Sequence, residues 1–381
     1  MFAAACTAAC LSHLEDPEVR VRLGVCDLLR VLATRRGAAL WDDVRERVLT
    51  SIDEHFDRDA LLRVRPHPGD APRDDNIDAL SEASVRSTQS YLGDLLASSY
   101  RAATPGTGEL RHDTEGWQCL ETSFLALRAV IEGCGPSFTP HVTPELRGLV
   151  YTALVHKNRF VREAALYIVA AMADALDDEG LRNVLPELAP QLRRGMGDNW
   201  SMVRYAACVA TRSVVQRTMD NDEVMSVLIP PICLNRFYVA EGVRAYSQAT
   251  WKMVAGDSAL VTKHVDAVVE HYLWCSKSSN HAVREAACAS VAEVLSRVDA
   301  AEPHAPRLLR ALLLCFKDAS WPVRAAACDA CGRCIAARPD ACAFALPELY
   351  SLFEAHLSDN VPSVREDAAI ALGARVWLLY V

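Results

Sequence analysis

Val-Arg pairs recur along this chain at a nearly constant spacing. The pairs of the regular stretch begin at Val161, Val203, Val243, Val283, Val323 and Val364. Neighbouring pairs are therefore 42, 40, 40, 40 and 41 residues apart. A fixed period of about 40 residues is typical of a solenoid in which each repeat is a pair of helices. No other feature of the sequence constrains the fold as strongly.

Each pair opens an apolar stripe with helical periodicity. In the first regular copy the stripe consists of Val161, Ala165, Ile168, Val169 and Met172. This spacing places the five side chains on one face of a helix, and the small alanine lets a neighbouring helix approach closely. We therefore predict that the second helix of each repeat begins at its Val-Arg pair. The matching first helices are expected near 144–156, 184–195, 222–234, 263–276, 304–317 and 344–357.

The expected fold class is all-α, a right-handed α-solenoid of about eight or nine helical-hairpin repeats. Residues 136–381 make up the regular part, with the period of about 40 residues. Residues 1–135 carry weaker copies, including Val21-Arg22 and Val85-Arg86. Two stretches at about 57–79 and 99–115 interrupt these copies, and their proline, glycine and charged residues predict loops.

The turn before each pair completes the pattern. An aspartate stands five residues before the valine in four copies, at Asp16, Asp198, Asp318 and Asp359. This arrangement resembles that of HEAT repeats. The resemblance implies a structural ladder in which aspartates and arginines of successive repeats are paired. Its members here are Asp16, Arg22, Asp198, Arg204, Asp318, Arg324, Asp359 and Arg365.

Three copies depart from the pattern, because His156, Tyr238 and Ser278 stand where the aspartate is expected. We expect the ladder to be interrupted there, with a softer joint between the repeats. The arginine series has an alternative interpretation as a phosphate-binding track. Its strict registration with aspartate favours the ladder.

Composition limits the kind of partner. The chain has 40 basic and 49 acidic residues and a net charge of −9. A nucleic-acid-binding protein usually presents a basic face, so protein partners are favoured and nucleic acid is disfavoured. No apolar run reaches the length of a membrane span. The 14 cysteines are spread through helical segments, which favours reduced thiols and a cytoplasmic location, with the nucleus as an alternative.

Four cysteines close together invite a metal or redox interpretation. They are Cys328, Cys331, Cys334 and Cys342. In the sister repeats, the positions of the first three are held mostly by core residues such as Val169 and Val214. Free cysteine behaves as a small apolar filler, so core packing is favoured over zinc binding or redox chemistry.

The sequence shows no pattern that predicts catalysis. No histidine is followed by glutamate, and no glycine-rich phosphate loop or nucleophile elbow is present. We therefore expect no catalytic residues, no bound metal and no cofactor. An enzyme on a HEAT frame remains an alternative, and it would require a cluster of carboxylates or histidines on facing helices.

The turns inside the repeats are the best candidates for function. In a solenoid they line up as one edge, and exposed aromatic and arginine side chains are common anchors of protein interfaces. The candidate partner-binding residues are Lys157, Arg159, Phe160, Asn199, Trp200, Arg236, Phe237, His281, Trp321 and Asn360. Packing of each ring on the neighbouring turn is the alternative interpretation.

These turns resemble the partner-holding surface of the scaffold subunit of type-2A protein phosphatase and the tubulin-binding loops of TOG domains. We predict a non-enzymatic scaffold or adaptor that binds other proteins through these turns or through the concave helix face. Tubulin-binding and nucleic-acid-associated HEAT factors are the alternatives. A tubulin-binding role requires Lys157, Arg159 and Arg236 to be exposed together.

The C-terminal stretch Val376-Trp377-Leu378-Leu379-Tyr380-Val381 is strongly apolar. Solenoid ends normally present a polar outer face. We therefore expect either that the chain is part of a longer array or that this end docks onto another surface.

Overall fold

The computed structural model describes residues 2–56, 117–254 and 259–379. The loops predicted at about 57–79 and 99–115 and the Val85-Arg86 copy lie outside the described residues. So do the side chains of the apolar stretch from Val376 onward. The chain divides into two compact units, Met1–Arg217 and Thr218–Val381, and each is described by itself. The predicted change from irregular to regular repeats near residue 135 stays a prediction.

Unit 1 consists of paired helices, with no strand among its described residues. The second helices of successive repeats, α2, α7, α9 and α11, pack side by side in that order. The elements are α1 (Phe2–Ser12), α2 (Val19–Arg36), α3 (Ala38–Phe56), α7 (Trp117–Cys134), the 3-10 helix η2 (Gly135–His141), α8 (Pro144–Leu154), α9 (Arg159–Ala175), α10 (Asp178–Gly195) and α11 (Ser201–Val215).

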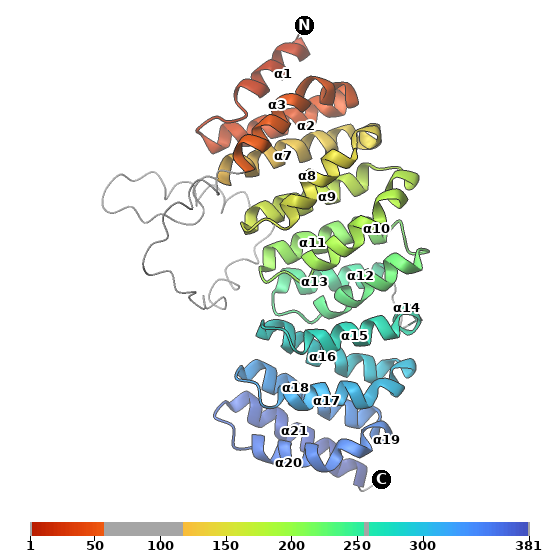
Figure 1. Ribbon diagram of the computed structural model, residues 1–381. Helices are drawn as coiled ribbons and strands as arrows, with labels where there is room; N and C mark the ends of the chain where they lie inside the picture. Colours follow the sequence, from red (N-terminus) through yellow and green to blue (C-terminus); the bar gives the residue numbers. More distant parts are fainter. Residues whose placement is uncertain (1, 57–116, 255–258, 380–381) are drawn as a thin grey trace, which may run out of the picture. The chain divides into compact units, whose positions relative to one another are not determined.

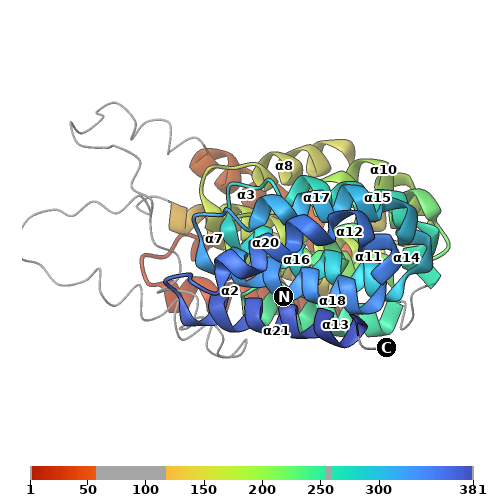
Figure 2. The same ribbon diagram turned by 90° about the horizontal axis from the view of Figure 1, so that it is seen from below.

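Unit 2 repeats the same construction, and α16, α18 and α21 pack side by side as second helices. Figure 2 shows the first helices α15 and α17 on the opposite side of this unit from α18 and α21. The elements are α12 (Asp222–Asn235), α13 (Glu241–Val254), α14 (Ala259–Lys263), α15 (Val265–Cys275), α16 (His281–Arg297), η3 (Asp299–His304), α17 (Ala305–Cys315), α18 (Trp321–Ala337), α19 (Pro339–Cys342), η4 (Ala343–Ala345), α20 (Leu346–His356) and α21 (Pro362–Leu379).

The prediction of an all-α fold of helical hairpins is confirmed. The second helices begin two residues before the Val-Arg pairs. In α9 and α16, the side chain of the preceding asparagine caps the helix there. Asn158 accepts a hydrogen bond from the Phe160 amide at 2.9 Å, and Asn280 accepts one from the Ala282 amide at 2.9 Å. The helix α10 begins earlier than predicted, since Asp177 caps it through the Gly180 amide at 2.7 Å.

The core lies between the two helices of each repeat and between neighbouring repeats. All six valines of the Val-Arg pairs are buried, and so are the alanines four residues later. These buried alanines are Ala165, Ala207, Ala287, Ala327 and Ala368. The apolar stripe predicted for the second helices is therefore the packed face of each unit.

The four neighbouring cysteines of unit 2 are core residues. Cys328, Cys331, Cys334 and Cys342 are free thiols and are almost completely buried. Burial raises the pKa of Cys328 to about 12 and the pKa of Cys342 to about 11. Thiols with such pKa values stay protonated at neutral pH, so they are poor nucleophiles.

Candidate protein-interaction site

In five repeats, the turn between the two helices is held by the arginine of the following Val-Arg pair. Its Nη1 donates to the carbonyl oxygens that lie six and five residues earlier in the turn. Arg162 donates to His156 and Lys157, both at 2.9 Å, and Arg324 donates to Asp318 at 2.9 Å and Ala319 at 3.2 Å. The same pair of bonds occurs at Arg22, Arg284 and Arg365. A single side chain therefore fixes the turn that precedes its own helix.

Three of these arginines also bind the aspartate of the next repeat. Arg162 binds Asp198 with Nε and Nη2 at 2.9 and 3.1 Å. The corresponding distances are 2.6 and 2.8 Å for Arg284 with Asp318, and 2.8 and 3.0 Å for Arg324 with Asp359. A bidentate guanidinium–carboxylate pair restricts both distance and orientation. The ladder therefore sets the position of one turn relative to the next.

Each ladder aspartate also organises its own turn. Asp198, Asp318 and Asp359 accept a hydrogen bond from the backbone amide two residues later, at 2.8–2.9 Å. Hydrogen bonds from Arg324 lower the pKa of Asp359. Burial raises the pKa of Asp318, but the hydrogen bonds from Arg284 and the Ser320 amide, together with the positive charge of Arg284, outweigh it and the pKa is lowered.

Other predicted ladder residues bond differently. Arg22 donates to the Thr122 hydroxyl of α7 at 3.1 Å, while Asp16 accepts from His13. Arg204 is buried and donates to the carbonyl of Asp198 at 3.1 Å. Within the described residues, Arg365 bonds to its own turn, at the carbonyls of Asp359 and Asn360.

Two of the three substituted turns keep the local bond of the aspartate. The Asn158 amide donates to His156 Nδ1 at 3.1 Å, and the Asn280 amide donates to Ser278 Oγ at 3.2 Å. At Ser278 the preceding arginine, Arg244, is paired instead with Glu241 of its own helix. A serine can therefore close the turn without joining it to the preceding repeat.

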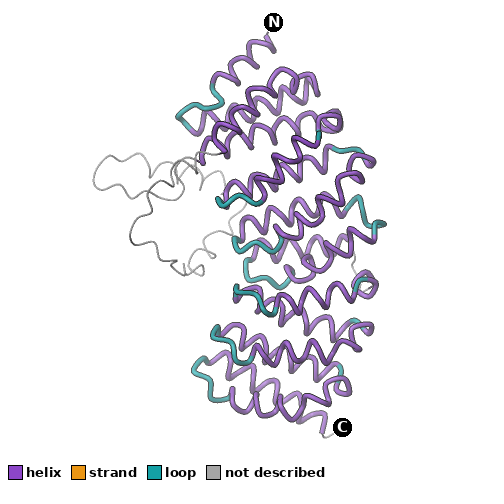
Figure 3. The backbone as a smooth tube through the Cα atoms, in the orientation of Figure 1, coloured by secondary structure: helices purple, strands orange, loops and turns teal. Residues whose placement is uncertain are grey.

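The turns lie along one edge within each unit, where Figure 3 shows them as loops at corresponding ends of the helix pairs. In unit 1, Lys157 and Asn199 are exposed at this edge. Arg159 lies over the Trp200 ring at 3.7 Å and over the Phe160 ring at 4.8 Å. These three side chains are partly exposed, so the two rings pack on a cation and still present a face to solvent.

Arg236 does not belong to the exposed edge, and this corrects its inclusion among the binding residues. Only 8% of it is exposed. Its guanidinium forms an ion pair with Glu293 of α16 and lies over the Trp251 ring at 4.4 Å. Because Arg236 is buried, the set of exposed bases that a tubulin-binding role requires is incomplete. Phe237 beside it is partly exposed.

The turn edge of unit 2 is more apolar than predicted. Trp321 is 47% exposed, Asn360 is exposed and His281 is partly exposed. Trp274 and Leu314, which the sequence analysis missed, are 67% and 69% exposed. They stand in the last turns of α15 and α17, exactly one period of 40 residues apart. Their position in the sequence could have indicated their exposure, because each is a large apolar residue outside the apolar stripe of its helix.

A pocket of ≈ 270 Å³ opens at the turn edge of unit 1. It lies between the α8–α9 turn and the α10–α11 turn. Apolar side chains contributing to its lining are Leu154, Val155, Leu166 and Val203. The polar side chains are His156, Lys157, Arg162, Gln191, Arg194 and Asp198.

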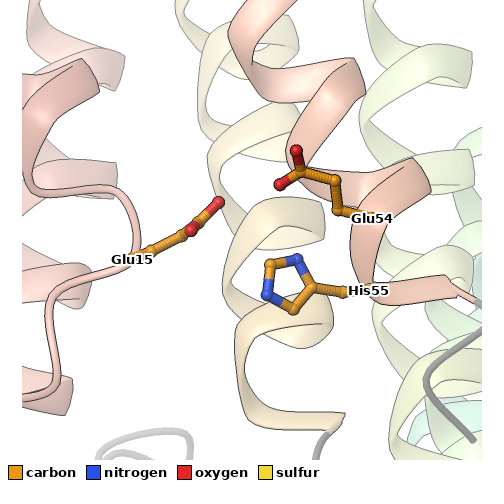
Figure 4. A group of neighbouring side chains, drawn as sticks. All are labelled: Glu15, Glu54 and His55. Carbon is orange, nitrogen blue, oxygen red and sulfur yellow. The ribbon is translucent and has the colours of Figure 1, made fainter.

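Three side chains near the end of α3 could together hold a metal ion. Glu15, Glu54 and His55 offer ligand atoms within 4.8 Å of one another, and Figure 4 shows them converging. Arg47 already pairs with Glu15 at 2.9 Å and with Glu54 at 3.8 Å. His55 Nδ1 lies 2.6 Å from the Ser51 carbonyl oxygen. Arg47 neutralises one of the two negative charges, so the group is already an ion-pair cluster around this arginine.

No helix in the described parts of the chain is both long enough and apolar enough to cross a bilayer. No curated protein sequence matches the chain. A profile described as HEAT-like repeat matches residues 159–210 and 321–374. These matches include the α9–α11 and α18–α21 repeats, which contain ladder pairs.

Solved structures with similar backbones are also repeat proteins. Kap121p bound to RanGTP is 12% identical over 99% of this chain, with a TM-score of 0.45, and the chain spans 34% of its length. A designed armadillo repeat protein is 19% identical over 59% of this chain and 98% of its own, with a TM-score of 0.33. Another designed armadillo protein, in complex with the peptide (KR)4, is 16% identical over 68% of this chain and 95% of its own, with a TM-score of 0.34.

The paired helices and the packed second helices define the class as an α-solenoid. The turn ladder and the profile matches identify the repeat, and the chain is a HEAT-repeat protein. This repeat fold is typical of proteins that bind other proteins.

Proposed function

We propose that this chain is a non-enzymatic scaffold or adaptor that binds a protein partner along the turn edge of its repeats. The exposure of Trp274 and Leu314 at equivalent positions in neighbouring repeats carries the proposal. Together with Trp321 they present roughly 400 Å² of apolar side-chain surface around two turns. Large apolar side chains at this exposure are costly in water, and burial against a partner would remove that cost.

The frame beneath these side chains suits recognition. The bidentate pairs Arg284–Asp318 and Arg324–Asp359 hold the turns at fixed separations. A rigid frame lowers the ordering cost of association, since the contact residues are already in place. The free cysteines support a reducing compartment, and we propose the cytoplasm, with the nucleus as the alternative.

The test is co-purification of partners from cells with a turn-edge variant. Trp274→Ala combined with Leu314→Ala removes the two most exposed side chains of the edge while leaving the ladder intact. Val31→Ala combined with Ile370→Ala is the matched control, because both residues are exposed and stand on second helices.

We expect the turn-edge variant to lose partners that the control retains. Loss in the control alone would contradict the proposal and favour binding through the helix face. Equal recovery with both variants would also contradict it.

A further inference from the structure

The pocket at the turn edge of unit 1 has more cationic than anionic groups. Lys157, Arg162 and Arg194 are opposed by the single carboxylate of Asp198. With His156 neutral, these side chains carry a net charge of +2, whereas the chain as a whole carries −9. The excess positive charge is therefore a local property of this pocket.

The carboxylate inside the pocket is already used. Asp198 receives both Nε and Nη2 of Arg162, and it also accepts the Trp200 amide at 2.9 Å. The remaining donor nitrogen of Arg162, Nη1, is bound to the carbonyl oxygens of His156 and Lys157. This ion pair forms one wall of the pocket and leaves little bonding capacity for a ligand.

Three other side chains retain their donors. Lys157, Gln191 and Arg194 make no side-chain hydrogen bond or ion pair with any residue that the structure describes. Lys157 comes from the α8–α9 turn, while Gln191 and Arg194 come from the last turns of α10. Ammonium, amide and guanidinium donors from two adjacent repeats therefore border one hollow.

We propose that this pocket binds an aspartate or glutamate side chain of an acidic segment in the partner protein. A carboxylate would satisfy the donors of Lys157 and Arg194 with charge-assisted hydrogen bonds. The volume of ≈ 270 Å³ lies just below the range of typical small-molecule pockets, which suits one side chain. The aliphatic wall from Leu154, Leu166 and Val203 would pack on its methylene groups.

An acidic protein segment fits this surface better than a nucleic acid. Nucleic-acid binding depends on many phosphate contacts along a positively charged surface. Here the excess positive charge is confined to one small pocket, which suits a single carboxylate better than a run of phosphates. The inference rests on the proposed function, since it names the chemistry of the partner at one place on the turn edge.

The test measures binding of fluorescein-labelled hexaglutamate to the purified full chain by fluorescence anisotropy. Binding is measured at two salt concentrations, about 50 mM and about 150 mM, because added salt screens interactions between exposed charges. The pocket variant is Lys157→Glu with Arg194→Glu. The control variant is Arg193→Glu with Lys277→Glu, which makes the same change in net charge at exposed positions outside the pocket. Circular dichroism of both variants establishes that they are folded.

We expect hexaglutamate to bind the wild-type chain, with an affinity that falls as salt is added. We expect at least about a tenfold loss of affinity in the pocket variant and a smaller loss in the control. Equal loss in both variants would overturn the proposal, because it would reflect net charge alone. Absence of binding to the wild-type chain, or preference for an oligonucleotide of equal charge, would also overturn it.

This experiment separates the pocket from the scaffold function. Peptide binding depends on Lys157 and Arg194, whereas the co-purification test depends on Trp274 and Leu314 in unit 2. If the pocket variant binds hexaglutamate normally while the turn-edge variant still loses partners, only the pocket assignment fails.

Discussion

The ladder arginines serve two purposes with one side chain. Nη1 of Arg284 holds the turn before its own helix, while Nε and Nη2 hold Asp318 of the next repeat. Removing the aspartate leaves a partly buried guanidinium without its carboxylate, and such a loss is costly. Ser278 closes its turn but forms no bond with the arginine of the preceding repeat. Replacing its side chain therefore leaves no guanidinium without a partner.

We predict that Asp318→Ala lowers the free energy of unfolding by about 1–3 kcal/mol. Ser278→Ala should lower it by about 0.5 kcal/mol or less, because only one partly exposed hydrogen bond is lost. Urea unfolding of both variants beside the wild type is the measurement. Equal losses would show that the link between repeats contributes nothing to stability.

A buried carboxyl group predicts an unusual dependence on pH. Glu121 of α7 is 5% exposed, and burial followed by the charge of Glu163 raises its pKa to about 8. Its ordinary pKa of 4.5 applies in the unfolded chain. Between these two values the folded protein binds a proton that the unfolded chain has released, so the free energy of unfolding falls as pH rises.

We predict that the wild-type chain loses stability on the order of 3 kcal/mol through this group as pH rises from about 5 to 8. Glu121→Gln keeps the shape and removes the ionisation, so it should be more stable than the wild type at pH 8 and should flatten this slope. Urea midpoints across the range provide the measurement. An unchanged slope in the variant would rule out Glu121 as the source.

The closeness of neighbouring helices also depends on single residues. A Cβ added at Gly133 of α7 would lie 2.5 Å from the Arg30 carbonyl oxygen and 2.5 Å from the Ala33 side chain of α2. At Gly332 of α18, a Cβ would lie 3.0 Å from the Ala371 side chain of α21. The first contact is blocked by backbone, whereas the second is a tight side-chain contact.

We predict that Gly133→Ala separates α2 from α7 and lowers the free energy of unfolding by about 1–3 kcal/mol, although alanine is the better helix former. Gly148→Ala is the control, because a Cβ there meets nothing within 4 Å, and it should leave stability equal or slightly higher. Thermal unfolding of the pair measures the difference. A stability gain at Gly133 would contradict the close approach.

At the scale of elements, the periodicity of the sequence predicted the positions of the helices whose residues are buried. The stripe from Val161 onward located the second helices to within two residues, since every repeat buries the same positions. Isolated contacts escaped prediction. Arg236 pairs with Glu293, which is 57 residues away in the sequence, and no local sequence pattern predicts this pairing. Trp274 and Leu314 were missed because a stripe identifies buried residues and says nothing of exposed ones.

At the scale of the whole molecule, the acidic charge and the apolar turn edge act together. A net charge of −9 disfavours nucleic acid, while exposed tryptophan and leucine side chains favour a protein surface. The net charge follows from the composition, but only the structure shows that the exposed apolar side chains and the basic pocket lie at turns. The central claim is that the partner contacts this turn edge.

Site-specific photo-crosslinking tests that claim most directly. A benzophenone amino acid is placed at Leu314 on the turn edge, and in a separate protein at Ile370 on a second helix, since both positions are exposed. The proposed function predicts crosslinks to a co-purifying protein from position 314 and few from position 370. Crosslinks from position 370 alone would contradict it.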